Sequence, residues 1–134
     1  MATLHKEIVI GAPRALVWDA LRDIGALHTR LVPGFVVDTK LDGSDARMVT
    51  FGNGMVVREP ILSIDNDRHR LAWCVEGGAT THYHAVIEVL DAPGGCRVVW
   101  TTDFLPHAAE APIAGMQDQA LSTMKRTLEA AAAR

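Results

Sequence analysis

The pattern of apolar and polar positions separates a long strand-like region from a terminal segment with helical spacing. Between Ala111 and Ala133, apolar residues recur three and four positions apart, which places them on one stripe of a helix. The stripe comprises Ile113, Met116, Ala120, Leu121, Met124, Leu128 and Ala131. A stripe of this length must be buried, and a long antiparallel sheet is the natural surface on which to bury it.

Most of the chain before this helix alternates with the two-residue period of β-strands. We predict seven strands, at Leu4–Ile10, Phe35–Leu41, Arg47–Phe51, Met55–Ile64, His69–Glu76, Thr80–Leu90 and Cys96–Phe104. Turn residues at hairpin spacing separate the last six strands, and Gly52-Asn53-Gly54 is the clearest of these signals. Such short turns predict an antiparallel meander. Pro60 interrupts one strand, where we expect an edge position or a bulge.

Two short helices are predicted between the first and second strands. Pro13 suits the first turn of a helix that spans Ala15–Leu21, because its missing N–H costs nothing there. Asp23 is the expected N-cap of a second helix, Ile24–Arg30. The predicted fold class is therefore α+β, with a curved seven-stranded antiparallel sheet wrapped around the long C-terminal helix.

Composition narrows the class of protein without naming a function. The chain has 134 residues, 49% hydrophobic and 22% charged, which suits one soluble domain covering residues 1–134. A net charge of −3 argues against a nucleic-acid partner, and no run is long enough for a membrane span. The N-terminus lacks the features of a signal peptide, so we expect a cytoplasmic protein. Its two cysteines, Cys74 and Cys96, have no metal-binding spacing and are expected to be ordinary thiols.

Several local phrases, in this order along the chain, resemble one known superfamily. They are Ile8–Pro13 running into Val17–Leu21, Arg58-Glu59, Asp65 ahead of Leu71-Ala72-Trp73, and Gly94–Trp100. This layout resembles the START-like (SRPBCC) superfamily, and within it most closely the bacterial polyketide cyclase/dehydrase-type group. The resemblance implies a helix-grip fold with a cavity between sheet and helix. It leaves the function open, because cyclases, hydrolases, lipid and hormone carriers and chaperone activators share this scaffold.

Strand parity predicts which side chains face the helix. The inward sets are Val98, Trp100, Thr102 and Phe104 on the last strand, and Tyr83, Ala85, Ile87 and Val89 on the one before it. Leu71, Trp73 and Val75 continue the wall, and Phe35, Val37, Thr39 and Leu41 supply its far side. The candidate ligand-binding residues are Trp73, Tyr83, Trp100 and Thr102, beneath Met116, Ala120 and Met124 of the helix. The alternative is that these large rings only fill the core.

Arg58 and Glu59 are neighbours on a strand, so one of them is expected to face the helix, where a charge needs a partner or water. The resemblance to aromatase-like members implies that Arg58 and Tyr83 orient polar oxygens of a ring substrate, and Arg58 therefore joins the candidate ligand-binding set. The alternative is an ion pair on the outer surface of the sheet.

The histidines are candidates for two roles, as metal ligands and as acid–base groups. His82 and His84 share a strand face, with Asp103 nearby, but parity puts that face outside, so we predict solvated histidines and no metal. His28 and His107 lie in connections near a potential cavity mouth, either as acid–base groups or as ordinary surface histidines. The sequence contains no paired carboxylates, nucleophile elbow, phosphate loop or dinucleotide fingerprint, so we expect no cofactor.

Together these features predict a protein that binds a small apolar molecule, of the aromatic or polyketide-like kind that the resemblance implies. Cyclase/dehydrase- or hydrolase-like turnover and non-catalytic carriage or sensing stay open as alternatives, and no catalytic residue is assigned. A chaperone-activating module ranks last, because the outward residues of the sheet, such as Arg97, Thr101 and Glu88, are polar. The oligomeric state stays open between a monomer and a homodimer, because an exposed first strand could pair with another copy, although its charges discourage such pairing.

Overall fold

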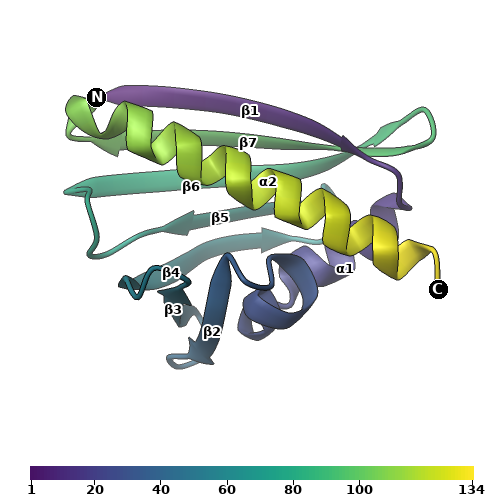
Figure 1. Cartoon of the computed structure of the whole chain (residues 1–134), viewed down its shortest axis with the longest axis horizontal. Coiled ribbons are helices and arrows are strands. Elements are labelled where there is room, and N and C mark those ends of the chain that lie inside the picture. The colour runs from purple at the N-terminus through teal and green to yellow at the C-terminus, as the bar shows by residue number, and fades with distance from the viewer.

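The computed structural model describes all 134 residues and contains the predicted α+β fold. Seven antiparallel strands form one sheet in the order β1-β7-β6-β5-β4-β3-β2 (Figure 1). The strands are β1 (Ala2–Ile10), β2 (Val36–Leu41), β3 (Ala46–Phe51), β4 (Val56–Asp65), β5 (Arg70–Cys74), β6 (His82–Ala92) and β7 (Gly95–Leu105). The first strand therefore returns to pair with the last, and β1 and β2 form the two edges of the sheet.

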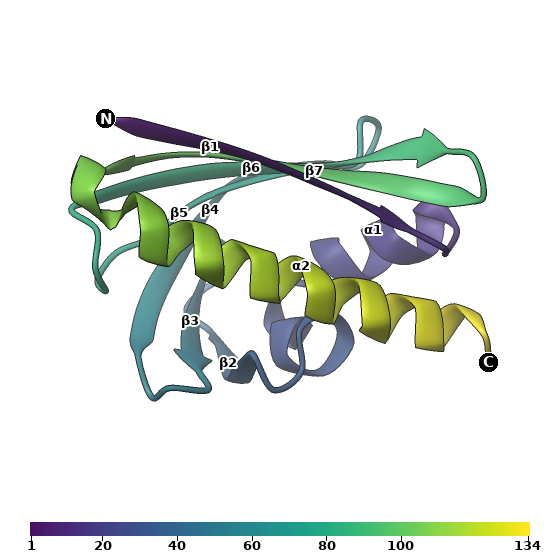
Figure 2. The same ribbon diagram turned by 45° about the horizontal axis from the view of Figure 1, so that its top comes forward.

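A long helix, α2 (Glu110–Ala132), crosses one face of this curved sheet (Figures 1 and 2). Its bounds lie one residue from the predicted ones, and Ala120, Leu121, Met124 and Leu128 of the predicted stripe are buried. Two polar side chains tie the helix to the end of β1. The Lys125 ammonium donates a hydrogen bond to the Val9 carbonyl at 2.8 Å, and the Glu129 carboxylate accepts one from the Gly11 N–H at 2.7 Å.

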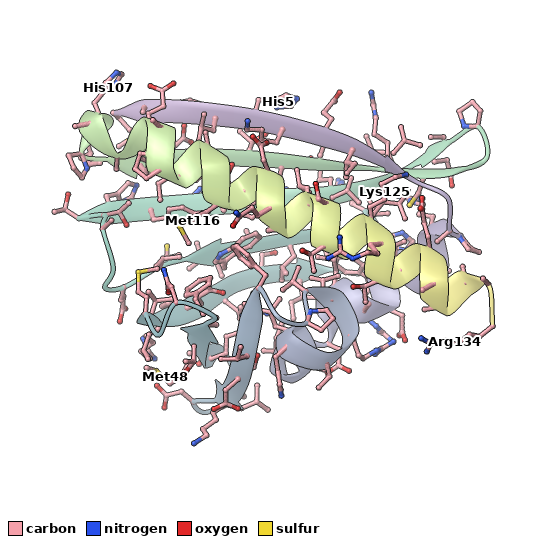
Figure 3. The ribbon with its side chains drawn as sticks, in the orientation of Figure 1. His5, Met48, His107, Met116, Lys125 and Arg134 are labelled. Atoms are coloured by element: carbon pink, nitrogen blue, oxygen red, sulfur yellow. The ribbon has the colours of Figure 1, made fainter.

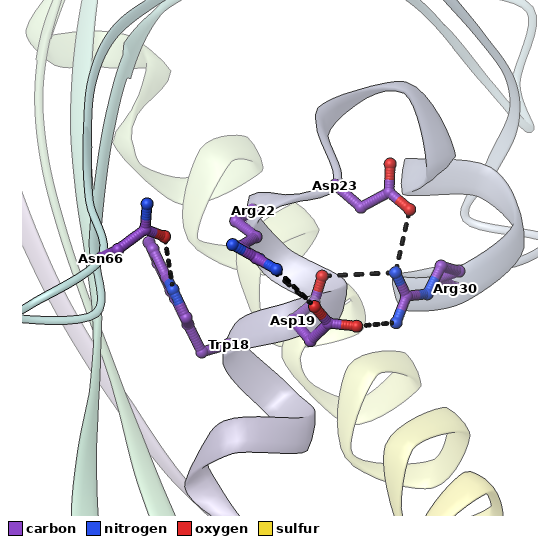
Figure 4. Close-up of polar contacts among 6 residues, drawn as sticks. All are labelled: Trp18, Asp19, Arg22, Asp23, Arg30 and Asn66. Atoms are coloured by element: carbon purple, nitrogen blue, oxygen red, sulfur yellow. Dashed lines mark hydrogen bonds and ion pairs between the residues drawn. The ribbon is translucent and has the colours of Figure 1, made fainter.

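The segment between β1 and β2 contains α1 (Arg14–Arg22), a 3-10 turn η1 (Ile24–Ala26) and a π-helical turn η2 (Leu27–Leu31). The Pro13 carbonyl accepts the first hydrogen bonds of α1, from Leu16 and Val17. Asp23 takes the predicted N-cap position ahead of Ile24, but two turns, η1 and η2, replace the single predicted helix Ile24–Arg30. The Asp23 carboxylate makes no capping bond and instead accepts a hydrogen bond from the Arg30 guanidinium at 2.9 Å (Figure 4).

Arg30 also reaches Asp19 of α1 at 2.7 Å, and Arg22 approaches the same carboxylate at 3.0 Å. Figure 4 shows the four charged side chains linked in this way, beside a separate hydrogen bond from the Trp18 indole to Asn66 at 3.0 Å. The two arginines hold the pKa of the Asp19 carboxyl below its usual value, mainly through the hydrogen bond from Arg30. These bonds fasten η2 to α1, whose own buried face comprises Val17, Trp18, Ala20 and Leu21.

On β6 and β7 the predicted parity is confirmed in full. Their register is unbroken from the pair His82–Leu105 to the pair Ala92–Gly95. All eight residues predicted to face inward on these strands are at most 9% exposed: Tyr83, Ala85, Ile87, Val89, Val98, Trp100, Thr102 and Phe104.

On β2 and β4 the alternation is broken by bulges. The register of β2 shifts by one residue at Val37, which turns that side chain outward and leaves it 54% exposed. The prediction for Val37 is therefore wrong. Leu41, also predicted to line the wall, is 60% exposed at the end of the strand, where it packs over Gly25. Thr39 is buried as predicted.

Pro60 marks the point at which β4 exchanges one neighbour for another. It is the last β4 residue paired with β3, and Ile61 is the first paired with β5. A register shift follows at Leu62, so the expected bulge is present beside Pro60. The alternative of an edge position is wrong, because β4 lies between β5 and β3.

Candidate ligand-binding cavity

A cavity of about 190 Å³ lies between the sheet and α2. Of its 28 lining residues 20 are hydrophobic, and they come from α1, η2, α2 and every strand except β1. An apolar cavity of roughly 150 Å³ is large enough to take up benzene. This cavity therefore has room for a molecule of about one or two rings.

Six of the predicted ligand-binding residues line this cavity: Trp73, Tyr83, Trp100, Met116, Ala120 and Met124. The Trp73 and Trp100 rings lie 5.8 Å apart, tilted by 45°, and form an aromatic floor on the sheet. Figure 3 shows Met116 extending from α2 toward the sheet. Phe35 and Val75, which parity placed on the wall, also line the cavity.

The other two predicted site residues do not line the cavity. Arg58 lies on the outer face, where its guanidinium contacts Asp42 at 2.7 Å and Glu76 at 3.2 Å. The structure corrects its assignment to the pocket, because the neighbouring Glu59 takes the inward position. Thr102 faces inward and is fully buried, but it does not line the cavity, and its hydroxyl accepts a hydrogen bond from Gln117, which does.

Gln117 connects Tyr83 and Thr102 in a buried polar network. Its amide nitrogen donates hydrogen bonds to the Tyr83 hydroxyl at 3.2 Å and the Thr102 hydroxyl at 2.8 Å. Burial raises the pKa of Tyr83 to about 12, although the hydrogen bond from Gln117 partly opposes this rise. Tyr83 is therefore a protonated phenol at neutral pH. Sequence reasoning missed Gln117, yet its position four residues after Ile113 and before Leu121 puts it on the apolar stripe.

A buried ion pair forms the second polar feature of the cavity. Arg47 and Glu59 are cross-strand partners on β3 and β4, and both line the cavity. The Arg47 Nε–H donates to Glu59 Oε1 at 2.9 Å, and Arg47 Nη1 donates to the Ile24 carbonyl at 3.2 Å. Their side chains are only 4% and 8% exposed. Sequence reasoning left open whether Arg58 or Glu59 faces inward and missed Arg47, although Arg47 shares strand parity with the fully buried Val49.

The cavity opens near the N-terminal end of α2. Its exposed lining residues gather there, in the β3–β4 turn, the β5–β6 loop and the first turn of the helix: Asn53, Gly77, Gly78, Ala79 and Pro112. Gly77 and Gly78 have positive φ values of 98° and 71°, which side chains rarely adopt. The loop therefore passes close to the opening without side chains that would block it.

None of the histidines considered above lines the cavity. His107 precedes α2 and points away from the molecule, with its side chain 73% exposed (Figure 3). His28 is half-buried in η2, and His82 and His84 lie on the outer face of β6, where parity placed them. No group of three or more histidine, cysteine, aspartate or glutamate side chains is arranged to hold a metal ion.

The sequence matches a family model described as "Polyketide cyclase / dehydrase and lipid transport" over residues 1–132. The chain therefore belongs to this family and, with its helix-grip fold, to the START-like superfamily that the sequence resembles. A comparison with curated proteins finds no match. None of the helices is long and apolar enough to cross a membrane.

Solved structures share the fold at low sequence identity. An uncharacterized protein from Bacillus thuringiensis superposes with a TM-score of 0.86 at 17% identity, covering 95% of this chain and 98% of that one. A protein from Thermobifida fusca has a TM-score of 0.76 at 27% identity, with 96% and 91% covered. Ara h 8.0201 has a TM-score of 0.75 at 16% identity, with 95% and 97% covered.

Proposed function

We propose that the protein binds a small, largely apolar molecule of one or two rings in the cavity between the sheet and α2. The observation that carries this proposal is the cavity itself, about 190 Å³ with a mainly hydrophobic lining. Protein cores are normally packed without such voids. A mainly apolar wall that faces water or empty space is unfavourable, because it lacks the packing partners of a filled core. A bound apolar molecule offsets that cost, and the family description, which names lipid transport and cyclase activity, supports such a ligand.

Chemistry on the bound molecule, of a cyclase/dehydrase or hydrolase kind, would rest mainly on positioning and exclusion of water. Glu59 is the only carboxylate among the lining residues and is therefore the group available to accept a proton. Tyr83 is a hydrogen-bond donor rather than a base, because its raised pKa keeps the phenol protonated. Carriage without chemistry is the alternative, and the two are separated by whether a bound compound leaves unchanged.

Isothermal titration calorimetry with naphthalene tests the binding. The wild-type protein is expected to bind it, and Ala120→Phe is expected to abolish binding because Ala120 lines the cavity and the ring would fill it. Ala130→Phe on the exposed side of α2 is the matched control and should bind like the wild type. Failure of the wild type to bind naphthalene, or equal binding by Ala120→Phe, would contradict the proposal.

Native mass spectrometry of gently purified protein then addresses the natural ligand. A compound released on denaturation gives the chemical class, and incubating that compound with fresh protein tests turnover. A changed mass indicates an enzyme, and an unchanged compound indicates a carrier.

A further inference from the structure

The ion pair of Arg47 and Glu59 differs in its hydrogen bonding from the polar network of Gln117, Tyr83 and Thr102. Gln117, Tyr83 and Thr102 bond to one another, and Gln117 Oε1, the atom of this group that has no partner, is fully enclosed. Arg47 and Glu59 meet through a single contact, Nε to Oε1. An arginine and a carboxylate can form two parallel hydrogen bonds, so this pair uses only half of its capacity.

The two atoms that this pair leaves over are unpaired and are not fully enclosed by the protein. Glu59 Oε2 accepts no hydrogen bond from the protein, and Arg47 Nη2 donates none. Some polar atoms of the protein are fully enclosed and lack a partner, but these two are not among them. Both atoms therefore retain access to the open space that their residues line. The negative charge of Glu59 also contributes to the raised pKa of Tyr83, which fits a carboxylate that shares this space.

A buried carboxylate oxygen without a hydrogen-bond donor is costly, and a charged acceptor forms stronger hydrogen bonds than a neutral one. A hydroxyl satisfies both free atoms, because it donates to a carboxylate oxygen and accepts from a guanidinium N–H. A carboxylate ligand has no proton to donate and places a second negative charge beside Glu59. An apolar ligand leaves both atoms unpaired.

We propose that Arg47 and Glu59 select neutral, hydroxyl-bearing ring compounds of the phenol class, through a hydrogen bond from the ligand hydroxyl to Glu59 Oε2. This specificity rests on the proposed function of the same cavity. It assigns the rings of the ligand to the apolar wall with Trp73 and Trp100, and its hydroxyl to the β3–β4 side.

The test compares the affinity of three probes of nearly equal size, 2-naphthol, 2-fluoronaphthalene and 2-naphthoate, by isothermal titration calorimetry. Wild-type protein is expected to bind 2-naphthol about tenfold or more tightly than 2-fluoronaphthalene, as expected for a hydrogen bond to a charged group. Binding of 2-naphthoate is expected to be weaker than that of 2-naphthol.

Variants test which residues cause the preference for 2-naphthol. Glu59→Gln keeps the size of the side chain, but once its amide oxygen pairs with Arg47 it offers the ligand hydroxyl a neutral donor in place of a charged acceptor, so the preference should fall well below tenfold. The double variant Arg47→Met/Glu59→Leu replaces the pair by apolar side chains and should bind 2-naphthol and 2-fluoronaphthalene equally. Glu76→Gln removes a carboxylate from the outer face and should keep the preference. Binding of 2-fluoronaphthalene shows that each variant is folded around an open cavity.

The outcomes separate the two levels of the account. If wild-type protein binds 2-naphthol and 2-fluoronaphthalene equally, or 2-naphthoate as tightly as 2-naphthol, the specificity is overturned and the cavity function stands. If the double variant binds 2-fluoronaphthalene but keeps the preference for 2-naphthol, another group binds the ligand hydroxyl. The proposed specificity of Arg47 and Glu59 is then also overturned. If wild-type protein binds none of the probes, the cavity function fails and the specificity fails with it.

Discussion

The two halves of the sheet obey the same hydrogen-bonding rules but differ in regularity. The β6–β7 hairpin keeps one register along its whole length. Its inward-facing residues are all at most 9% exposed. The β2–β4 region contains two register shifts, at Val37 and Leu62, and buries the charged pair Arg47 and Glu59. The regular half supplies Tyr83, Ile87 and Trp100 to the cavity wall, and the irregular half supplies the charged pair of the cavity.

The two halves of the sheet therefore contribute differently to the stability and the specificity of the protein. An unbroken ladder with apolar inward residues favours close packing, and every such residue contributes burial. A bulge bends a strand and re-aims its side chains, which lets a small sheet curve around the helix. Substitutions in the two halves test this division.

Removing a large ring from each half should give unequal losses of stability. Phe104 on β7 is fully buried, so Phe104→Ala is expected to lower the free energy of unfolding by about 3–5 kcal/mol. Phe51 on β3 is half-buried and lines the cavity edge-on to Phe35, so Phe51→Ala should cost clearly less. Urea unfolding measures both losses. Equal losses would show that the irregular half is packed as tightly as the regular one.

Breaking the buried ion pair should cost more than replacing it. Glu59→Ala leaves the Arg47 charge buried without its partner and is expected to lower stability by about 3 kcal/mol or more. The double variant Arg47→Met/Glu59→Leu is expected to stay within about 1 kcal/mol of the wild type, because apolar replacement of a buried pair is often neutral. Urea unfolding of Arg47→Met, Glu59→Leu and the double variant completes the cycle. A double variant as unstable as Glu59→Ala would mean that the pair holds the irregular half together.

Gln117→Met should disturb the polar network with a smaller loss. We expect a decrease of about 1–2 kcal/mol in stability, because the Tyr83 and Thr102 hydroxyls lose their buried donor. The pKa of Tyr83 should rise further, since the lost hydrogen bond from Gln117 acts to lower it. Tyr83 is the only tyrosine, so alkaline absorbance titration reports on it alone. An unchanged or lowered pKa would contradict the role of Gln117.

The same titration gives a pH dependence of stability. Because the folded pKa of Tyr83 is about 12 and the unfolded value is about 10, its contribution is complete below about pH 10. It is lost as the pH rises toward 12. Protein unfolded in urea should therefore titrate near pH 10, well below the folded protein.

The smallest effect is expected on the surface, at the Arg30 cluster of Figure 4. The lowered pKa of Asp19 means that its pairing with Arg30 stabilises the fold above about pH 4 and is lost as the pH falls through the folded value. Arg30→Ala should therefore lower Tm slightly at neutral pH, and the difference from the wild type should shrink in acid. Arg126→Ala, on the exposed side of α2, serves as the control. A difference that grows in acid would contradict this assignment.

The fold and the part of the cavity formed by β6 and β7 could be predicted from the sequence. Alternation along β6 and β7 is strict, so parity alone places Tyr83 and Trp100 correctly. Parity fails at Val37 because that residue is the extra one in a bulge of β2, and nothing in the local sequence indicates a bulge there. Arg47 was missed because a charge on a strand is usually solvated, and its burial depends on the pairing of β3 with β4.

Methyl NMR of the methionines tests the central claim that the cavity takes up a small apolar molecule. Of the five methionines, Met55, Met116 and Met124 line the cavity, whereas Met1 and Met48 do not. On titration with naphthalene, the methyl signals of the first three are expected to shift together while those of Met1 and Met48 stay in place. Shifts confined to Met1 or Met48, or no shift at all, would contradict the account.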